Sequence, residues 1–378
     1  MLPYSKYSIP CALLLLTTAC SNEEPLIPPP TSSMATQLTF GTSPHHAGRA
    51  HWEVDSNSDL NFVWDADNIG TEVVCAIGGF GPNQTFLPGY ATAEANTPPL
   101  YATYTTIAPN EASRNSATFR TLNYFNASLS ELEGCTLHAV TPVLTNAENH
   151  AATMQSDATM FSATLRMPST FKQISNGMPD YLKPYMYMYA AATIENGDAM
   201  LSFKHIPTTL RFKIKNKRIL DAHVNSIMCT IDEQTPVASK SVNYAATSNN
   251  KTPELTYSNE GHTSVTINID SDLKADATYT AYTLVLPLPE TNAFQDKKIK
   301  IYVTTDSDTK ILSYELDGQT LYAANAAKGY NVYNWVAGNL YTFNLNLNDV
   351  LTFDGIIVED WDKESIDGGE VEESTENK

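Results

Sequence analysis

The sequence predicts an all-β protein built of antiparallel sheets. Twenty Tyr among 378 residues, with many Thr and Asn, favour strands and turns, because aromatic and β-branched side chains suit a half-buried pleated surface. Short apolar segments bounded by Gly, Pro and Asn recur along the whole chain, whereas capped segments with helical periodicity are rare. Since no helices alternate with these strands, antiparallel sandwiches are favoured over a parallel βαβ sheet.

Length and composition set the number of domains and exclude one class of partner. A chain of 378 residues suits two domains, and 42% hydrophobic against 17% charged residues supply enough apolar material for their cores. The formal net charge is −19, so the averaged field repels phosphate backbones. We therefore expect no nucleic-acid partner.

Residues 1–19 have the features of a signal peptide. Lys6 precedes an apolar segment that is too short to span a bilayer as a permanent helix. The small residues that end at Ala19, directly before Cys20, resemble a bacterial lipobox. The resemblance implies cleavage between Ala19 and Cys20 and acylation of Cys20, for example with palmitate, which anchors the chain in the outer membrane. An ordinary secretory signal followed by a chance cysteine is the alternative.

Residues 20–33 are expected to form a lipidated tether. Residues 21–24 read Ser-Asn-Glu-Glu and resemble the acidic tag that exports some lipoproteins to the outer leaflet, so we expect display at the cell surface. Residues 25–33 are rich in Pro, Ser and Thr, a composition that makes an extended, solvated segment.

The remaining chain is expected to form two sandwiches, residues 34–195 and 196–361, followed by an acidic tail at 362–378. Gly177, Pro179 and Pro184 interrupt the strand pattern before the second series begins. Residues 209–215 alternate apolar and cationic side chains, which predicts a half-solvated antiparallel strand. Further strands are expected at 37–40, 72–77, 136–140, 199–203, 264–269, 282–288, 298–304, 311–316, 340–347 and 356–358, and residues 128–133 are compatible with a short helix.

Three of the five cysteines remain after the signal peptide and the lipidated Cys20 are set aside. They are Cys75, Cys135 and Cys229, and an odd number cannot form a complete internal disulfide framework. Cys75 and Cys229 lie within apolar segments, so we expect both to be small buried hydrophobic residues.

The sequence contains none of the common catalytic motifs. It has no Gly-x-Ser-x-Gly elbow, no His-Glu-x-x-His and no phosphate-binding loop. His45, His46 and His51 lie close together but lack Cys or carboxylate partners at a recognised spacing, so loop positions are expected for them. We expect no enzyme activity, no cofactor and no metal site.

Three motifs follow one another along the chain. The first joins residues 38–40 to the Trp-Asp-Ala-Asp-Asn-Ile-Gly turn at 64–70, the second covers 201–216, and the third joins 337–345 to 357–361. In this order they resemble the fimbrillin family, the pilins and pilus-associated lipoproteins of type V fimbriae. Together they extend over nearly all of the chain that follows the signal peptide.

The resemblance implies two tandem Greek-key, transthyretin-like β-sandwich domains and a role as a fimbrial (pilus) subunit, accessory subunit or tip subunit in adhesion and biofilm formation. It also implies assembly by strand exchange, in which other fimbrial subunits donate a β-strand. The family cleaves after an arginine in the region of Arg49, so cleavage between Arg49 and Ala50 is one interpretation of this residue. The other, equally weighted, is a solvated loop cation.

A second function stays open from the sequence. Everything after Trp361 is acidic and poorly apolar, unlike the donor strand of stalk subunits. A monomeric surface lipoprotein that binds a glycan or a host protein is therefore the alternative to a fimbrial subunit.

Overall fold

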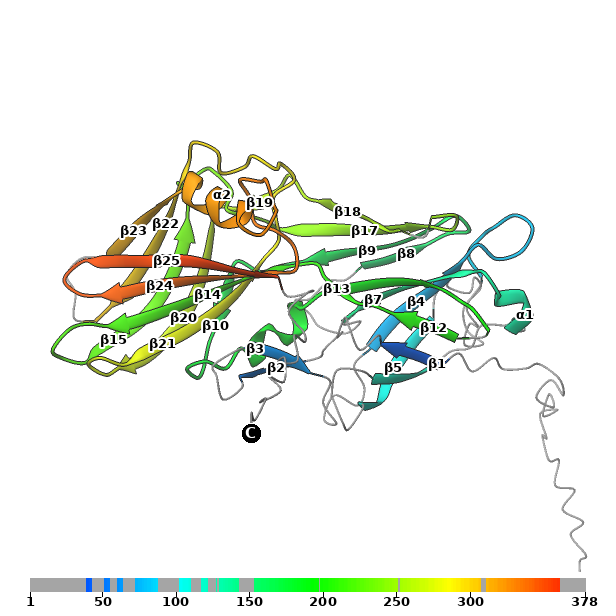
Figure 1. Ribbon diagram of the computed structural model, residues 1–378, viewed down its shortest axis with the longest axis horizontal. Helices are drawn as coiled ribbons and strands as arrows, with labels where there is room; N and C mark the ends of the chain where they lie inside the picture. The colour runs from blue at the N-terminus through cyan, green and yellow to red at the C-terminus, as the bar shows by residue number, and fades with distance from the viewer. Residues whose placement is uncertain are drawn as a thin grey trace, which may run out of the picture. The chain divides into compact units, whose positions relative to one another are not determined.

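The computed structural model describes residues 39–42, 51–54, 60–63, 72–87, 102–109, 117–121, 127, 129–142, 153–196, 198–250, 252–306 and 311–360. Most of the regular structure in these ranges is β-strand, arranged in sheets, so the predicted all-β sandwich class is confirmed (Figure 1). The described residues belong to a single unit that spans Ala35–Lys378.

One sandwich is made by a five-stranded and a four-stranded sheet. Leu210, Phe212 and Ile214 alternate along one strand and are all buried between the sheets. Tyr314 of the first sheet meets Phe353 of the second, with 5.0 Å between the ring centroids. The first sheet has the order β10 (Thr170–Lys172), β20 (Ser264–Leu273), β15 (Ala222–Thr230), β22 (Lys298–Thr305) and β23 (Leu312–Asp317). The second has the order β21 (Thr278–Val285), β14 (Thr208–Asn216), β24 (Asn339–Leu347) and β25 (Leu351–Asp360).

Strand β14 differs from the expected half-solvated antiparallel strand. It is antiparallel to β21 but parallel to β24, so it lies inside its sheet. Its cationic face is only partly solvated, because Arg211 is 4% exposed while Lys213 and Lys215 are half-buried. The expected alternation of apolar and cationic side chains is present in β14. Arg211, however, is buried, and a buried guanidinium needs an acidic partner, which the neighbouring sequence does not contain.

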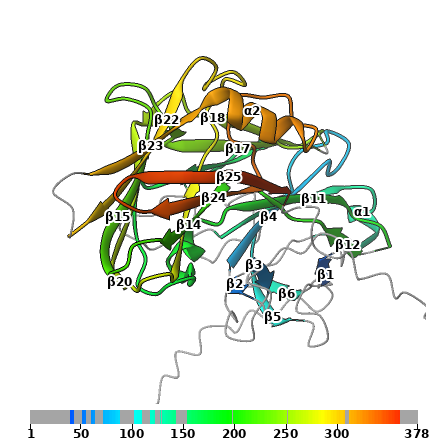
Figure 2. The same cartoon turned by 60° about the vertical axis from the view of Figure 1, so that its left-hand side comes forward.

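A helix that the sequence analysis did not anticipate covers one end of this sandwich. Helix α2 (Gly318–Ala326) begins after Asp317, whose carboxylate accepts a hydrogen bond from the Gln319 amide at 2.8 Å. It lies next to β23 and β25, and the turned view in Figure 2 shows it above β25. Nearby, Trp335 is 2% exposed and donates from Nε1 to the Val237 carbonyl at 2.8 Å.

The other sandwich contains a sheet with two buried faces. All six residues of β7 are buried, and so are residues 73–77 of β4. A sheet that is covered on both sides explains why residues 73–77 of β4 read as continuous apolar sequence. The sheet has the order β13 (Lys204–His205), β11 (Met188–Thr193), β7 (Thr136–Thr141), β4 (Glu72–Gly78), β5 (Ala102–Pro109) and β6 (Ala117–Thr121).

A four-stranded sheet packs against one of those faces. Tyr244 lies 5.9 Å from Tyr189 of β11, and Phe161 lies 6.3 Å from Phe86, between ring centroids. The sheet has the order β18 (Glu254–Tyr257), β17 (Ser241–Thr247), β9 (Met160–Arg166) and β8 (Thr153–Ser156).

Three two-stranded sheets and two short helical segments complete the described structure. The pairs are β1 (Thr39–Thr42) with β12 (Asp198–Leu201), β2 (His51–Val54) with β3 (Leu60–Val63), and β16 (Ala238–Ser239) with β19 (Gly261–His262). Helix α1 covers Leu129–Leu132, within the expected 128–133, and the 3-10 helix η2 covers Asp180–Tyr185.

Each of the two sandwiches contains strands from both sides of residue 196. Strand β9 pairs with β17 from far along the chain, and β10 pairs with β20 (Figure 1). Each sandwich is therefore completed by residues from both sides of 196. The division of the chain into 34–195 and 196–361 remains a prediction.

Candidate functional site

Strand β1 is the first described strand of the chain, and its pairing makes it the leading candidate for a functional site. It forms a parallel ladder with β12, in which Phe40 stands opposite Ala199 and Thr42 opposite Leu201. On its other side β1 lies next to β6. The ladder is only four residues long.

The partner strand β12 is rooted in the hydrophobic core. Ala199 is 1% exposed and Leu201 is fully buried, and Phe203 and Ile206 continue the buried series into β13 and β14. The Ile206 amide also donates to the Tyr187 carbonyl at 2.9 Å. Strand β12 is thus held by packing on one side, whereas β1 meets it through a short backbone ladder.

Sequence reasoning placed strands near residues 37–40 and 199–203 but did not pair them. Parallel pairing between segments so far apart leaves no local signal, because any two strands of suitable apolar pattern have compatible edges. The pairing of β1 with β12 therefore became visible only in the structure.

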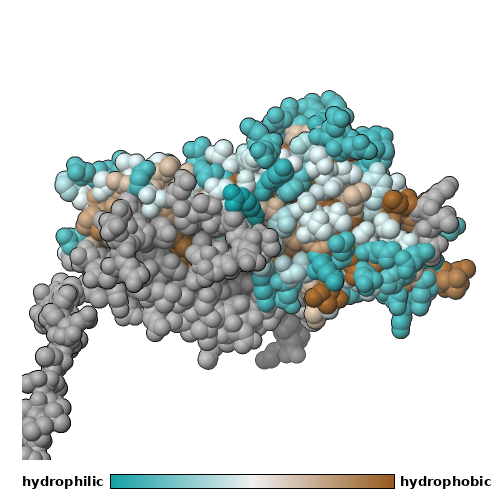
Figure 3. All heavy atoms as spheres, turned by 180° about the vertical axis from the view of Figure 1, so that it is seen from behind, coloured by the Kyte–Doolittle hydropathy of each residue, from teal (hydrophilic) through white to brown (hydrophobic). Residues whose placement is uncertain are grey.

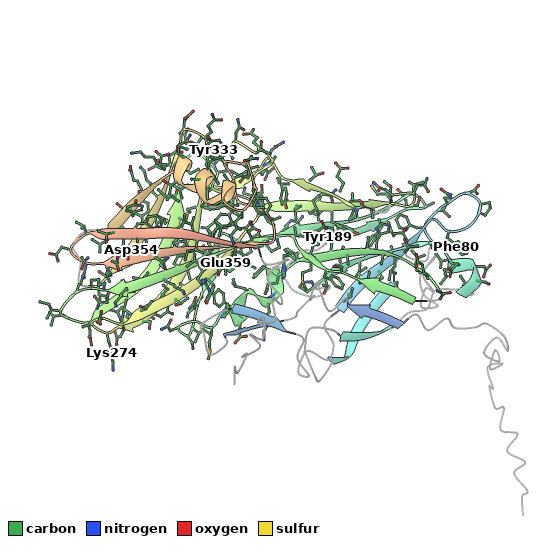
Figure 4. The ribbon with its side chains drawn as sticks, in the orientation of Figure 1. Phe80, Tyr189, Lys274, Tyr333, Asp354 and Glu359 are labelled. Carbon is green, nitrogen blue, oxygen red and sulfur yellow. The ribbon has the colours of Figure 1, made fainter. Side chains whose placement is uncertain are left out.

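A partly buried ion pair holds the last described strand of the same chain. The Arg211 guanidinium donates from Nη2 to Glu359 Oε2 of β25 at 2.9 Å and from Nε to Thr342 Oγ1 at 2.8 Å. Glu359 lies near the carboxyl end of β25, on the side of the strand's length that approaches the other sandwich; Asp354 marks the opposite part of the strand in Figure 4. This contact spans β14, β24 and β25 and supplies the partner that buried Arg211 requires.

The expected burial of Cys75 and Cys229 is confirmed. Both thiols are free and buried, as is the thiol of Cys135. Burial raises the pKa of the Cys229 thiol to about 12 and raises the pKa of Cys75 further. None of the three is therefore a reactive thiolate in the native chain.

Most of the site residues expected from the sequence lie outside the described residues. These are Ala19 and Cys20 of the lipobox-like motif, Arg49 and Ala50 of the processing candidate, and the histidines at 45 and 46. Trp64 and Trp361 of the family-like motifs lie outside them too. Their roles stay predictions.

Among the described residues, no group of three or more His, Cys, Asp or Glu side chains could hold a metal ion. The nearest arrangement is His223, whose ring nitrogens lie 2.7 Å from Asp272 and 3.0 Å from Asp270. These two hydrogen bonds raise the pKa of His223. Within the same part of the chain, no helix is long and apolar enough to cross a membrane.

The exposed apolar side chains are scattered over several loops and strands. On the face seen in Figure 3, hydrophilic residues dominate the described surface and apolar groups are separated by them. The most exposed apolar residues are Ile174, Ile219 and Leu220. Exposed apolar groups of this small size are normal on protein surfaces and by themselves indicate no ligand.

A family model described as fimbrillin-like matches residues 87–361. Among solved structures, the chain is similar to a putative cell adhesion protein from Bacteroides uniformis, with 14% identity, a TM-score of 0.48, and coverage of 86% of this chain and 97% of that chain. A putative cell adhesion protein from Bacteroides ovatus gives 13% identity, a TM-score of 0.49, and coverage of 86% and 96%.

The fimbrial anchor protein Mfa2 from Porphyromonas gingivalis gives 8% identity, a TM-score of 0.38, and coverage of 86% of this chain and 98% of that chain. No curated protein sequence matches the chain. The family match spans well over half of the chain.

Proposed function

Because the chain belongs to the fimbrillin-like family, we propose that it is a fimbrial subunit, or an accessory or tip subunit, that exchanges β1 for a strand of another subunit. The observation that carries this proposal is the short parallel ladder between β1 and β12. Each backbone hydrogen bond contributes about 0.5–1.5 kcal/mol net. A ladder of four residues therefore holds β1 far less firmly than the strands inside the sheets.

Loss of β1 creates a driving force for assembly. It bares one edge of β12, the strand that carries buried Ala199 and Leu201, and an unpaired edge is a template for another extended strand. A donor strand restores the ladder and covers apolar surface at on the order of 25 cal/mol per Å². Cleavage at Arg49, which follows β1 in the chain, is the step that we propose makes β1 separable.

A reversible cross-link between β1 and β12 tests the exchange. Thr39 stands opposite Asp198 in the ladder, so Thr39→Cys with Asp198→Cys places two thiols at paired positions, within the usual reach of a disulfide. The native thiols of Cys75, Cys135 and Cys229 are buried and do not compete. The experiment uses lipid-free protein treated with a trypsin-like protease, followed by electron microscopy and denaturing gels.

We expect the reduced double variant to form filaments or ladders and the oxidised one to stay monomeric until a reductant is added. Equal assembly of the oxidised variant, with the disulfide verified, would contradict strand exchange at β1. Arg49→Ala is the matched control for processing: unchanged mature N-termini and unchanged incorporation would show that Arg49 is a loop cation. A wild-type chain that stays monomeric under all conditions favours the glycan-binding or host-protein-binding alternative.

We further propose that the chain reaches this place as a lipoprotein of the outer membrane, anchored through Cys20 and displayed on the cell surface. The support is the sequence that ends at Ala19 and the acidic residues that follow Cys20. Metabolic labelling with a fatty-acid analogue should label wild type and not Cys20→Ala. Protease shaving of intact cells should remove the protein, and resistance in intact but not lysed cells would refute surface display.

A further inference from the structure

In the sandwich that contains β14, side chains and not a second neighbouring strand form hydrogen bonds with the outer side of the edge strand β21. Strand β21 ends its four-stranded sheet and pairs with β14 on one side only. Its other side faces residues 173–181, which we call the edge strap. The strap begins where β10 ends, and the Gln173 amide still donates to the Asn268 carbonyl of β20 at 2.9 Å. It is thus attached to one sheet while its side chains reach the edge of the other.

Gln173 imitates the backbone of a neighbouring strand. Its Nε2 donates to the Thr280 carbonyl at 2.7 Å and to the Ser175 carbonyl at 2.9 Å. Its Oε1 accepts from the Tyr282 amide at 3.0 Å and from the Tyr181 hydroxyl at 2.8 Å. The side chain is fully buried, and every hydrogen-bonding position of its amide is used.

Asn176 repeats the arrangement one step along the edge. Its Nδ2 donates to the Thr278 carbonyl at 3.2 Å, and its Oδ1 accepts from the Thr280 amide at 2.7 Å. The Gly177 amide adds a second donor to the Thr280 carbonyl at 3.0 Å. The two side-chain amides therefore engage β21 with the donor and acceptor spacing of a strand.

Tyr181 closes the far end of the strap. Its hydroxyl lies within hydrogen-bonding distance of both the Tyr282 carbonyl and Gln173 Oε1, and its single proton serves one of them at a time. Phe171 holds the strap in place, since its ring lies 6.2 Å from that of Tyr181 and 5.6 Å from that of Tyr185. The backbone groups of β21 that point away from β14 between Thr278 and Tyr282 thus all have partners. They are the Thr278 carbonyl and the amides and carbonyls of Thr280 and Tyr282.

We propose that the edge strap is a built-in guard that prevents a second copy of the chain from adding its β25 strand to the β21 edge. Strand β25 ends the same sheet on the opposite side and, among the described strands, pairs only with β24. It is 10 residues long and β21 is 8, so β25 is long enough to pair along the whole of β21. Because the edges differ, such pairing is head-to-tail and leaves a free edge at each end to which a further copy can add.

The proposed role of the edge strap is independent of the proposed exchange at β1. It acts at the edge of a different sheet, and its failure or success says nothing about the pairing of β1 with β12. Its effect is to remove a second strand-accepting edge from the chain.

The first test measures hydrogen exchange at single amides in the full-length lipid-free chain. Asn176→Ala removes both hydrogen bonds to β21, so exchange of the Thr280 amide is expected to accelerate about two- to ten-fold. Asn176→Asp keeps an oxygen that accepts from Thr280 and replaces the donor to Thr278 with a second acceptor, so exchange of the Thr280 amide should be slower than in Asn176→Ala. Equal rates in all three proteins would show that the side chain does not cap the edge.

The second test measures the oligomeric state by light scattering over a range of concentrations. The double variant Gln173→Ala/Asn176→Ala is expected to form concentration-dependent oligomers. Asn225→Ala, which loses one exposed hydrogen bond to Asp306 elsewhere in the sandwich, is the matched control and should behave as wild type. Gln173→Ala alone, which frees the Tyr282 amide, is the second variant if the double variant fails to fold.

A third substitution identifies the docking strand. Ile357 of β25 is 51% exposed, and a lysine on an edge strand opposes pairing, so Ile357→Lys in the double variant should restore the monomer. Oligomers that persist with Ile357→Lys overturn β25 as the docking strand. A folded, monomeric double variant with accelerated Thr280 and Tyr282 amides overturns the guard itself.

Discussion

His138 gives the sandwich that contains β7 a calculable sensitivity to acid. Its side chain is fully buried in β7, and its ring lies edge-on to Phe86 with 6.0 Å between centroids. Neither ring nitrogen has a hydrogen-bond partner among the described residues. Burial lowers the pKa of His138 from 6.5 to about 4, because the charged form loses its hydration.

The pKa difference fixes the sign and the size of the effect. Between pH 6.5 and 4 the unfolded chain binds a proton at His138 that the folded chain does not, so the free energy of unfolding falls as the pH falls. At 1.36 kcal/mol per pKa unit, the loss approaches about 3 kcal/mol, and roughly 2.5 kcal/mol of it is reached by pH 4.5. Well above pH 6.5 this contribution is constant.

Urea unfolding of wild type and His138→Leu at pH 7.5 and pH 4.5 measures it, since all other titrating groups cancel in the comparison. We expect the variant to be at least as stable at pH 7.5, because an unpaired buried polar group costs about 1–3 kcal/mol. Its advantage should grow by about 2.5 kcal/mol at pH 4.5.

His223→Gln is the control with the opposite sign. The pKa of His223 is raised by Asp272 and Asp270, so its contribution is present below pH 6.5 and is lost as the pH rises through the folded-state value. Relative to wild type, His223→Gln should therefore lose stability on acidification. Parallel pH profiles of wild type and His138→Leu would refute the reasoning.

Three further predictions concern the other sandwich. Arg211→Met leaves Glu359, whose side chain is 25% exposed, without its cation and should lower the free energy of unfolding by about 1–3 kcal/mol in urea titrations; an unchanged value would mean that water replaces the pair. Gly318→Ala places a Cβ 2.0 Å from the Phe294 carbonyl oxygen, so its melting temperature should fall, and an unaltered one would show that α2 can shift. The buried Cys229 thiol should react with a thiol reagent at pH 8 only after denaturation; rapid labelling of the native chain would contradict its burial.

The all-β class and most strands of the sandwich that contains β14 can be predicted from local sequence. Segments such as 209–215, 298–304 and 340–347 combine apolar alternation with turn residues at their ends, and each lies in a strand of the structure. The strand expected at 282–288 begins earlier, at Thr278, and ends before Pro287, as a residue without an amide hydrogen requires.

What local sequence does not contain is the choice of partners. Nothing in β9 specifies β17, and nothing around Gln173 announces that its side chain meets a strand more than a hundred residues away. Helix α2 was not anticipated, because it has no apolar stripe and its Asp317 cap resembles a turn residue. The candidate site shares this property, since β1 and β12 are ordinary strands whose significance lies in their pairing.

The pairing of β9 with β17 has a consequence for a chain that emerges from its amino end. Thr164 of β9 reaches its neighbour Asn243 only 79 residues later in the sequence, so an early folding intermediate carries β8 and β9 with one long edge unsaturated. Contacts of such long range slow the search for the native state. We therefore expect the sheet that contains β8 and β9 to be completed only after β17 and β18 have been made, and not as the chain emerges.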